Sequence, residues 1–355
     1  YMTTLAWVAS FAVYQGGRPV VDLWGGDGWA RDTMVGVFSA TKGATAACVH
    51  RLVEQGVLDL DAPVARYWPE FGAAGKATIP LRWVLSHRAG IPIVHATLST
   101  AEVLAWSPVC TAIATQAPDW PPDSMHGYHV RTYGFILGEV VRRATGMTLG
   151  QLFAREIAVP LGLSWFIGLP ASHEPRVAAL TPPPLPDDPQ LRALHDRFLG
   201  PETPLGRALS GPGELAYGPI WNTRAVHAAE IPSSNGIADA RSVARFYAAL
   251  IGAVDGLRVL DPATLATACA VASDGPDGTL LLPTRFGLGF MLPPALGLAC
   301  GPASFGHPGA GGCLGFADPE RGLAFGYVTN TMQVGLTGDR RTETVVRAVY
   351  AALGQ

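Results

Sequence analysis

The two ends of the chain carry β-strand signals and the middle carries helix signals, and this order constrains the fold most. Residues 10–24 predict a β-hairpin, because two β-type runs flank the two-residue turn signal Gly16-Gly17. Residues 313–328 predict a second hairpin around the turn sequence Asp-Pro-Glu-Arg-Gly, and residues 343–353 predict a closing helix. We therefore expect an α+β fold, an α/β sandwich in which an antiparallel sheet is flanked by helices.

The middle of the chain shows the apolar spacing of helices. Residues 181–189 are rich in proline and open a long region without regular spacing, to about residue 234, which we expect to cover the active cleft. We expect a discontinuous α/β domain over residues 1–60 and 230–355. A mostly helical domain is expected over residues 61–229, with the active site between the two domains. The predicted helices are residues 44–52, 81–85, 134–144, 149–156 and 242–251.

The composition indicates a well-packed globular protein. Of the 355 residues, 48% are hydrophobic and 15% are charged, and the formal net charge is only −3, so neither disorder nor a nucleic-acid partner is expected. No apolar run reaches the length of about 18–20 residues that a membrane span requires, and the start lacks signal-peptide features. The five cysteines form no Cys-x-x-Cys pair. We therefore expect reduced thiols, a cytoplasmic location, no membrane association, and no metal or other cofactor.

Ser39 and Lys42 form a Ser-x-x-Lys motif at the start of the first predicted helix. Residues three apart share one helix face, so the Ser39 hydroxyl and the Lys42 amine are expected to meet. A serine hydroxyl becomes a good nucleophile only when a base removes its proton, and a lysine serves as that base only when neutral. The alternative is a helix-capping serine beside a solvated lysine. The chain has just one other lysine, Lys76, which gives the motif more weight.

Two further segments are candidates for the same site. Tyr128 lies in a loop just before a predicted helix, where a phenol near an ammonium group can relay a proton. Alone, a buried core tyrosine is the better interpretation of this residue. Residues 305–312 are glycine-rich, so their backbone N–H groups can approach a substrate closely, although a simple glycine-rich turn is equally consistent. No Gly-x-Ser-x-Gly elbow, His-Glu-x-x-His pair or phosphate-binding loop occurs.

These motifs, in this order, resemble those of the serine β-lactamase and penicillin-binding-protein superfamily. The chain is most similar to the class C-like branch called family VIII carboxylesterases, over most of its length, which implies a β-lactamase-like fold. The segments that carry the resemblance are residues 38–43, 85–92, 128–130, 305–312 and 316–320.

The resemblance implies a role for each site residue. Ser39 would form the acyl-enzyme, Lys42 would be the general base, and Tyr128 would relay protons, the last two acting as a coupled pair. The backbone N–H groups of Ser39 and Ala310 would form the oxyanion hole. His307 and Gly309, which stand where the lactamases have Lys-Thr-Gly, would help to bind the substrate.

Two departures from the lactamase pattern affect the expected substrate. Val130 stands where the lactamases have an asparagine, and His307 replaces a lysine that helps to hold the substrate carboxylate. Both changes favour a neutral ester over an anionic β-lactam. We therefore expect a serine carboxylesterase that hydrolyses small-molecule esters with short-chain or aryl groups. The alternatives are an acyltransferase, a weak β-lactamase or D-alanyl peptidase, and a catalytically idle scaffold of the same fold. The oligomeric state stays open.

Overall fold

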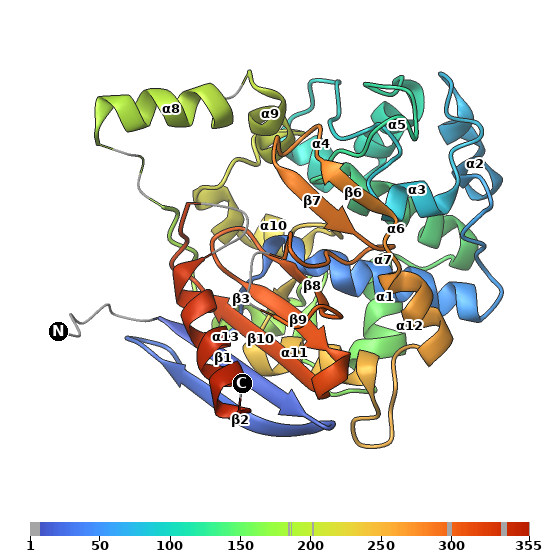
Figure 1. Ribbon diagram of the computed structural model, residues 1–355. Helices are drawn as coiled ribbons and strands as arrows, with labels where there is room; N and C mark the ends of the chain where they lie inside the picture. Colours follow the sequence, from blue (N-terminus) through green and yellow to red (C-terminus); the bar gives the residue numbers. More distant parts are fainter. Residues whose placement is uncertain are drawn as a thin grey trace.

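Strands from the two ends of the chain lie side by side in one antiparallel sheet. The computed structural model describes residues 8–183, 185, 187–200, 202–296, 300–334 and 339–354. Its main sheet has five strands in the order β2 (Arg18–Gly25), β1 (Ala9–Gln15), β10 (Leu323–Thr329), β9 (Leu314–Asp318) and β8 (Phe305–Pro308) (Figure 1). Strand β1 pairs with β10 from Ala9 opposite Thr329 to Gln15 opposite Leu323, so the first and last strands share the centre of the sheet. Both predicted hairpins, β1–β2 and β9–β10, are confirmed.

Each face of this sheet is covered by a helix, as the alternation of its side chains requires. Ala12 and Tyr14 of β1 contribute to the core that contains helix α11, whereas Val13 contributes to the core that contains helix α13. In Figure 1, α13 lies in front of the sheet and α11 lies behind it. Gly326 of β10 permits the close approach of α11, because a side chain there would collide with the backbone of that helix. The predicted α+β fold, an antiparallel sheet flanked by helices, is confirmed.

The helices predicted at residues 44–52, 81–85, 134–144, 149–156 and 242–251 are present, and several short helices that were not predicted lie among them. Helix α1 (Thr41–Glu54) begins two residues after Ser39 and runs across the middle of the molecule in Figure 1. No helix in the described part of the chain combines the length and the apolar character that crossing a membrane requires. The strands are β1 (Ala9–Gln15), β2 (Arg18–Gly25), β3 (Val35–Gly36), β4 (Trp165–Phe166), β5 (Ile237–Ala238), β6 (Ser273–Pro276), β7 (Pro283–Phe286), β8 (Phe305–Pro308), β9 (Leu314–Asp318) and β10 (Leu323–Thr329). The helices are α1 (Thr41–Glu54), α2 (Val64–Tyr67), α3 (Leu81–Leu85), α4 (Thr100–Leu104), α5 (Ser107–Thr115), α6 (Thr132–Thr145), α7 (Leu149–Phe153), α8 (Pro189–Leu199), α9 (Pro204–Ser210), α10 (Arg224–Ala228), α11 (Ala240–Ile251), α12 (Pro262–Cys269) and α13 (Arg340–Ala352).

The segment from residue 181 to 234 differs from the prediction, because it contains α8, α9 and α10 rather than one long irregular region. Prolines are compatible with these helices because Pro189 and Pro204 occupy the first helical position, where a missing N–H group costs nothing. The Thr203 side chain caps α9 by accepting a hydrogen bond from the Gly206 N–H. A capped, proline-initiated pair of helices therefore forms the upper left of the molecule in Figure 1.

A third hairpin, β6–β7, lies beside the helices although it belongs to the last third of the chain (Figure 1). Its Phe286 packs against the rings of His87 and Tyr128, with centroids 4.6 and 5.9 Å apart. An isolated bridge between Met291 and Gly306 connects this region to the edge strand β8. The division into residues 1–60 with 230–355 and residues 61–229 stays a prediction.

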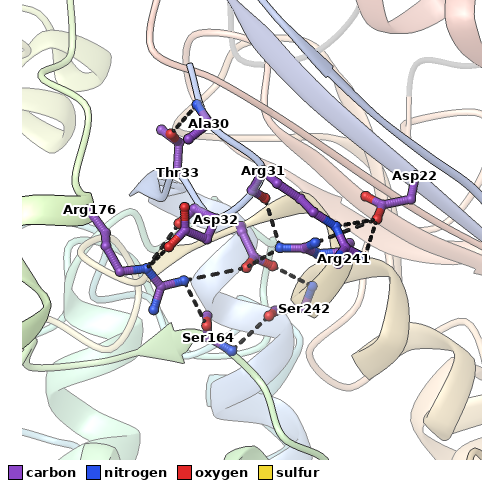
Figure 2. A network of polar contacts seen from close by, with 10 residues as sticks. Asp22, Ala30, Arg31, Asp32, Thr33, Ser164, Arg176, Arg241 and Ser242 are labelled. Carbon is purple, nitrogen blue, oxygen red and sulfur yellow. Dashed lines mark hydrogen bonds and ion pairs between the residues drawn. The ribbon is translucent and has the colours of Figure 1, made fainter. Parts of the chain in front are cut away.

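A network of charged side chains joins four segments that are distant in the sequence (Figure 2). The Asp22 carboxylate of β2 lies 3.0 Å from Arg31 and 3.5 Å from Arg241 at the start of α11. Arg176 in turn contacts Asp32 at 3.0 Å. The network therefore connects β2, the segment before β3, the segment that carries Arg176, and the start of α11.

Candidate active site

Ser39 lies at a sharp turn between β3 and α1. The preceding residue, Phe38, has a φ of +44°, a left-handed conformation that non-glycine residues adopt only when their surroundings impose it. Its ring is held edge-on between Tyr217 and Trp221, with both centroid distances 5.0 Å. The clamped Phe38 thus fixes Ser39 immediately before α1, close to the free N–H groups and the positive end of that helix.

Lys42 lies one helical turn after Ser39 and is fully buried. Its Nζ is 3.4 Å from the Ser39 Oγ, 2.8 Å from the Val130 carbonyl oxygen and 3.1 Å from the Ser233 carbonyl oxygen. A neutral amine has two N–H bonds and one lone pair. Because the two carbonyls can only accept hydrogen bonds, they take both N–H groups, and the lone pair is left for the Ser39 hydroxyl.

The surroundings of Lys42 favour the neutral amine. Burial lowers the pKa of Lys42 well below its usual value, and the nearby positive charge of Arg131 lowers it further. No carboxylate in the described residues forms an ion pair with Lys42. The lysine is therefore poised to accept a proton, which is the state that the Ser-x-x-Lys motif requires.

Tyr128 stands over Lys42, with the amine 4.6 Å from the centre of its ring. Burial raises the pKa of the Tyr128 phenol well above its usual value, and a hydrogen bond with Ser39 opposes part of this rise. The backbone N–H of Tyr128 donates to both oxygens of the buried Asp277 carboxylate, at 3.0 and 3.1 Å. Tyr128 is thus a neutral phenol, held in place from the β6–β7 hairpin.

His307 lies on β8 against the other side of the Tyr128 hydroxyl. Its Nδ1 is 2.7 Å from the Pro308 carbonyl oxygen, so Nδ1 carries the ring proton and donates it. Burial and the proximity of Lys42 lower the pKa of His307 to about 3, so the ring is neutral and Nε2 is an acceptor. The Tyr128 hydroxyl is 3.4 Å from this Nε2. His307 therefore presents a hydrogen-bond acceptor to the site, and not a positive charge.

Gly309 and Ala310 follow β8 directly. A side chain at Gly309 would collide with the Val37 carbonyl, so glycine permits the end of β8 to approach the Ser39 turn. The Gly309 N–H donates to the Cys313 carbonyl at 2.7 Å. Ala310 lines a cavity of about 10 Å³ together with Ser39, Tyr128, His307 and the apolar residues Leu280, Met291 and Pro308. All six predicted site residues thus come together at the edge of the sheet.

A larger, mostly apolar cleft of about 390 Å³ also reaches Ala310. Tyr217, which clamps Phe38, lines this cleft as well. The cleft therefore opens next to the nucleophile, between the helices α8 and α9 and the segment that follows β10. Its other described lining residues are Pro183, Leu185, His195, Leu199, Gly206, Leu209, Ser210, Ala216, Gly311, Met332, Gln333 and Val334.

Four buried histidines belong to the region around the site, and in the described part of the chain they form no metal site. His129 Nδ1 bonds to the Gly127 carbonyl at 2.6 Å, and the His129 backbone N–H donates to Nδ1 of His87 at 3.1 Å. Among the described residues, no three His, Cys, Asp or Glu side chains are arranged to hold a metal ion. The rings of His87 and His307 pack against Tyr128, whereas His126 bonds to the Thr284 hydroxyl and His129 bonds to backbone groups. All four histidines are buried.

Sequence reasoning missed two residues that support the site. Asp277 was available as part of an Asp-Gly pair, a common hairpin-turn signal, but its contact with Tyr128 spans 149 residues. Arg131 carried no signal, because its role depends on burial beside Lys42. Both positions become meaningful only once the fold brings them to the site.

A serine activated by a buried lysine, between an antiparallel sheet and a group of helices, defines a serine hydrolase of the β-lactamase-like kind. The sequence matches the family described as beta-lactamase over residues 8–349. The chain therefore belongs to the beta-lactamase family.

Individual relatives cover nearly the whole chain. Esterase/beta-lactamase LipL of Mycobacterium tuberculosis is 36% identical over 343 residues, which are 91% of this chain and 77% of that protein. A crystal structure of a family VIII carboxylesterase is 37% identical with a TM-score of 0.87, covering 97% of this chain and 92% of that one. EstA from Arthrobacter nitroguajacolicus is 35% identical with the same TM-score, covering 99% of this chain and 93% of that one. The resemblance to family VIII carboxylesterases that the motifs indicated is confirmed.

Proposed function

We propose that this protein is a serine carboxylesterase that hydrolyses small neutral esters, with short-chain or aryl groups, through an acyl-enzyme on Ser39. The observation that carries the proposal is the Lys42 amine, which is fully buried, donates to two carbonyls and lies 3.4 Å from the Ser39 Oγ. The relatives whose names include esterase or carboxylesterase support the same assignment.

In the first half of the reaction, the Ser39 Oγ attacks the ester carbonyl carbon as its proton passes to the Lys42–Tyr128 pair. The backbone N–H groups of Ser39 and Ala310 stabilise the negative charge that develops on the carbonyl oxygen. When the carbon–oxygen bond of the ester breaks, the pair returns that proton to the leaving alkoxide. The alcohol departs and the acyl group stays on Ser39.

In the second half, a water molecule attacks the acyl-enzyme and gives a proton to the same pair. The tetrahedral intermediate collapses, the bond to Ser39 breaks, and the proton returns to the Ser39 oxygen. The carboxylic acid then leaves, and the enzyme is restored. Neutral His307 accepts the hydrogen bond of the Tyr128 hydroxyl, which keeps the phenol oriented in both halves.

The lining of the site supports a neutral substrate. Val130 has a buried side chain that forms no hydrogen bonds, and His307 is uncharged, so neither residue supplies the amide or the cation that an anionic β-lactam uses. The adjoining cleft of about 390 Å³ is mostly apolar. A cytoplasmic location is part of the proposal and is supported by the five cysteines, all of which are free thiols.

The test is hydrolysis of a panel of p-nitrophenyl esters beside a chromogenic cephalosporin, for wild type and Ser39→Ala. We expect wild type to hydrolyse short-chain esters and Ser39→Ala to lose several orders of magnitude in rate. An alcohol added as a competing acceptor separates hydrolysis from acyl transfer, because a transferase forms mainly the new ester. Failure of wild type to turn over any ester would refute the assignment.

A further inference from the structure

Arg131 is a buried arginine that, in the described part of the chain, has no acidic partner. Only 2% of its surface is exposed, and no carboxylate in the described residues forms an ion pair with it. Its guanidinium donates instead to three backbone carbonyls, those of Ala208, Gly211 and Leu215. Burying a cation without a counter-charge is unfavourable for stability, so Arg131 is a candidate for a role beyond packing.

The three carbonyls belong to the segment that covers the site, α9 and the residues up to Tyr217. Several residues of this segment line the apolar cleft beside Ala310. The guanidinium also lies 5.5 Å from the ring centre of Trp221, one of the two rings that clamp Phe38. Arg131 therefore attaches the cover to the turn that presents the nucleophile.

The backbone of Arg131 is joined to the environment of Lys42. The preceding carbonyl, that of Val130, accepts a hydrogen bond from the Lys42 amine at 2.8 Å. Ser233, whose carbonyl also accepts from Lys42, donates its hydroxyl to the Arg131 carbonyl at 3.2 Å. The same residue thus contacts the cover through its side chain and the support of Lys42 through its backbone.

Burial is the larger cause of the lowered pKa of Lys42, and the positive charge of Arg131 adds to it. The other titratable groups around the amine lie on several elements, and all are neutral near pH 7 because burial opposes their charged forms. Arg131 remains cationic, since burial lowers its pKa only to about 10. These neutral groups are Tyr128 and His129 before α6, Tyr133 on α6, His87 after α3, and His307 on β8.

We propose that Arg131 is a positioning residue that links the cover, through its guanidinium, to the backbone that supports Lys42, and that its cationic side chain assists the activation of Ser39. The inference rests on the proposed function, in which Lys42 is the base. When the cover is ordered, its carbonyls hold the Arg131 side chain in the place from which it acts on Lys42, and Lys42 in turn activates Ser39.

The alternative is that Arg131 only holds backbone segments together, as the buried Lys76 does. Its amine donates to the carbonyls of Ala73, Ala114 and Gln116, and it lies outside the active site. A purely structural Arg131 would affect stability and substrate binding in the same way as any loosening of the cover. It would not change the pH at which the nucleophile becomes active.

The experiment is the pH dependence of kcat/KM for p-nitrophenyl acetate in Arg131→Met, with Leu205→Ala as the matched control. Leu205 is buried in α9, so its truncation loosens the cover while Arg131 keeps its charge. We expect Arg131→Met to shift the acid limb of the profile upward, on the order of one pH unit, and to raise KM. Leu205→Ala should raise KM and leave the acid limb where it is in wild type. Arg131→Gln, which keeps an amide donor, replaces Arg131→Met if the latter does not fold.

An acid limb that stays in place in the neutral variants, or that moves equally in Leu205→Ala, would overturn the proposal. The rate of Ser39 labelling by a fluorophosphonate probe gives the same pH profile without ester turnover. If wild type hydrolyses no ester, the proposed function fails, and the labelling profiles of wild type and the Arg131 variants still decide the role of Arg131.

Discussion

Replacing Asp277 with asparagine should disturb the active site from the β6–β7 hairpin without touching the substrate. One carboxylate oxygen, Oδ1, accepts from the N–H groups of Tyr128, Thr279 and Leu280, at 3.0, 2.8 and 2.8 Å. The other oxygen, Oδ2, accepts from the Tyr128 N–H at 3.1 Å and from the Thr284 hydroxyl at 3.0 Å. Asparagine keeps one acceptor oxygen but replaces Oδ2 with an NH₂ group. Because that group is itself a donor, it cannot accept the hydrogen bonds that the Tyr128 N–H and the Thr284 hydroxyl donate to Oδ2.

The size of the effect follows from these contacts. Hydrogen bonds to a charged group are worth about 1.5–3 kcal/mol each, and Asp277→Asn removes the equivalent of one or two of them while it weakens the others. We therefore expect the free energy of unfolding to fall by about 2–4 kcal/mol. Because Tyr128 loses part of its backbone anchor, kcat should fall about 10- to 100-fold, which is about 1.4–2.8 kcal/mol in barrier height.

Urea unfolding gives the stability, and steady-state kinetics on p-nitrophenyl acetate separates kcat from KM. The control is Asp274→Asn on the same hairpin, because Asp274 is an exposed carboxylate that pairs with Arg285 at the surface. The control should match wild type in both measurements. The reasoning is refuted if Asp277→Asn keeps both wild-type stability and wild-type kcat, or if KM rises while kcat is unchanged.

Three further results are expected. Lys42→Arg should be nearly as inactive as Lys42→Ala, because a guanidinium cannot be deprotonated at working pH. A rate for Lys42→Arg within about tenfold of wild type, about 1.4 kcal/mol in barrier height, would contradict the role of Lys42 as the base. Because the pKa of Lys42 is lowered, the amine stays neutral from high pH down to that pKa, and kcat/KM should decline as the pH falls through it. A rate that rises toward acid pH would contradict this prediction. The value of kcat/KM for an ester should exceed that for a cephalosporin, because the absence of an amide at Val130 and the neutral ring of His307 each remove a contact with the cephalosporin worth about 1–3 kcal/mol. Equal or greater cephalosporin hydrolysis would indicate a lactamase.

Local signals predicted much of this fold. The hairpins at the two ends have strong turn sequences, and the meeting of Ser39 with Lys42 follows from helical spacing alone. The same local reasoning misjudged residues 181–234, because a proline that begins a helix and a proline that ends one look alike without the cap before it.

The supporting parts of the site depend on long-range contacts that the sequence does not display. Asp277 reaches Tyr128 across 149 residues, and Arg131 reaches Leu215 across 84. The neutral state of His307 depends on its burial beside Lys42, and its tautomer depends on the Pro308 carbonyl. Residue types therefore indicated which groups act, whereas their protonation states and supports required the three-dimensional arrangement.

The most direct test of the account is the mass of the covalent intermediate. Wild-type protein is mixed with p-nitrophenyl acetate, quenched in acid and digested, and the peptide that contains Ser39 is examined for one added acetyl group. We predict acetylation at Ser39 in wild type and none in a folded Ser39→Ala variant, which should also lose ester turnover by several orders of magnitude. Acetylation at another residue, or substantial turnover by folded Ser39→Ala, would contradict the assignment of Ser39 as the nucleophile.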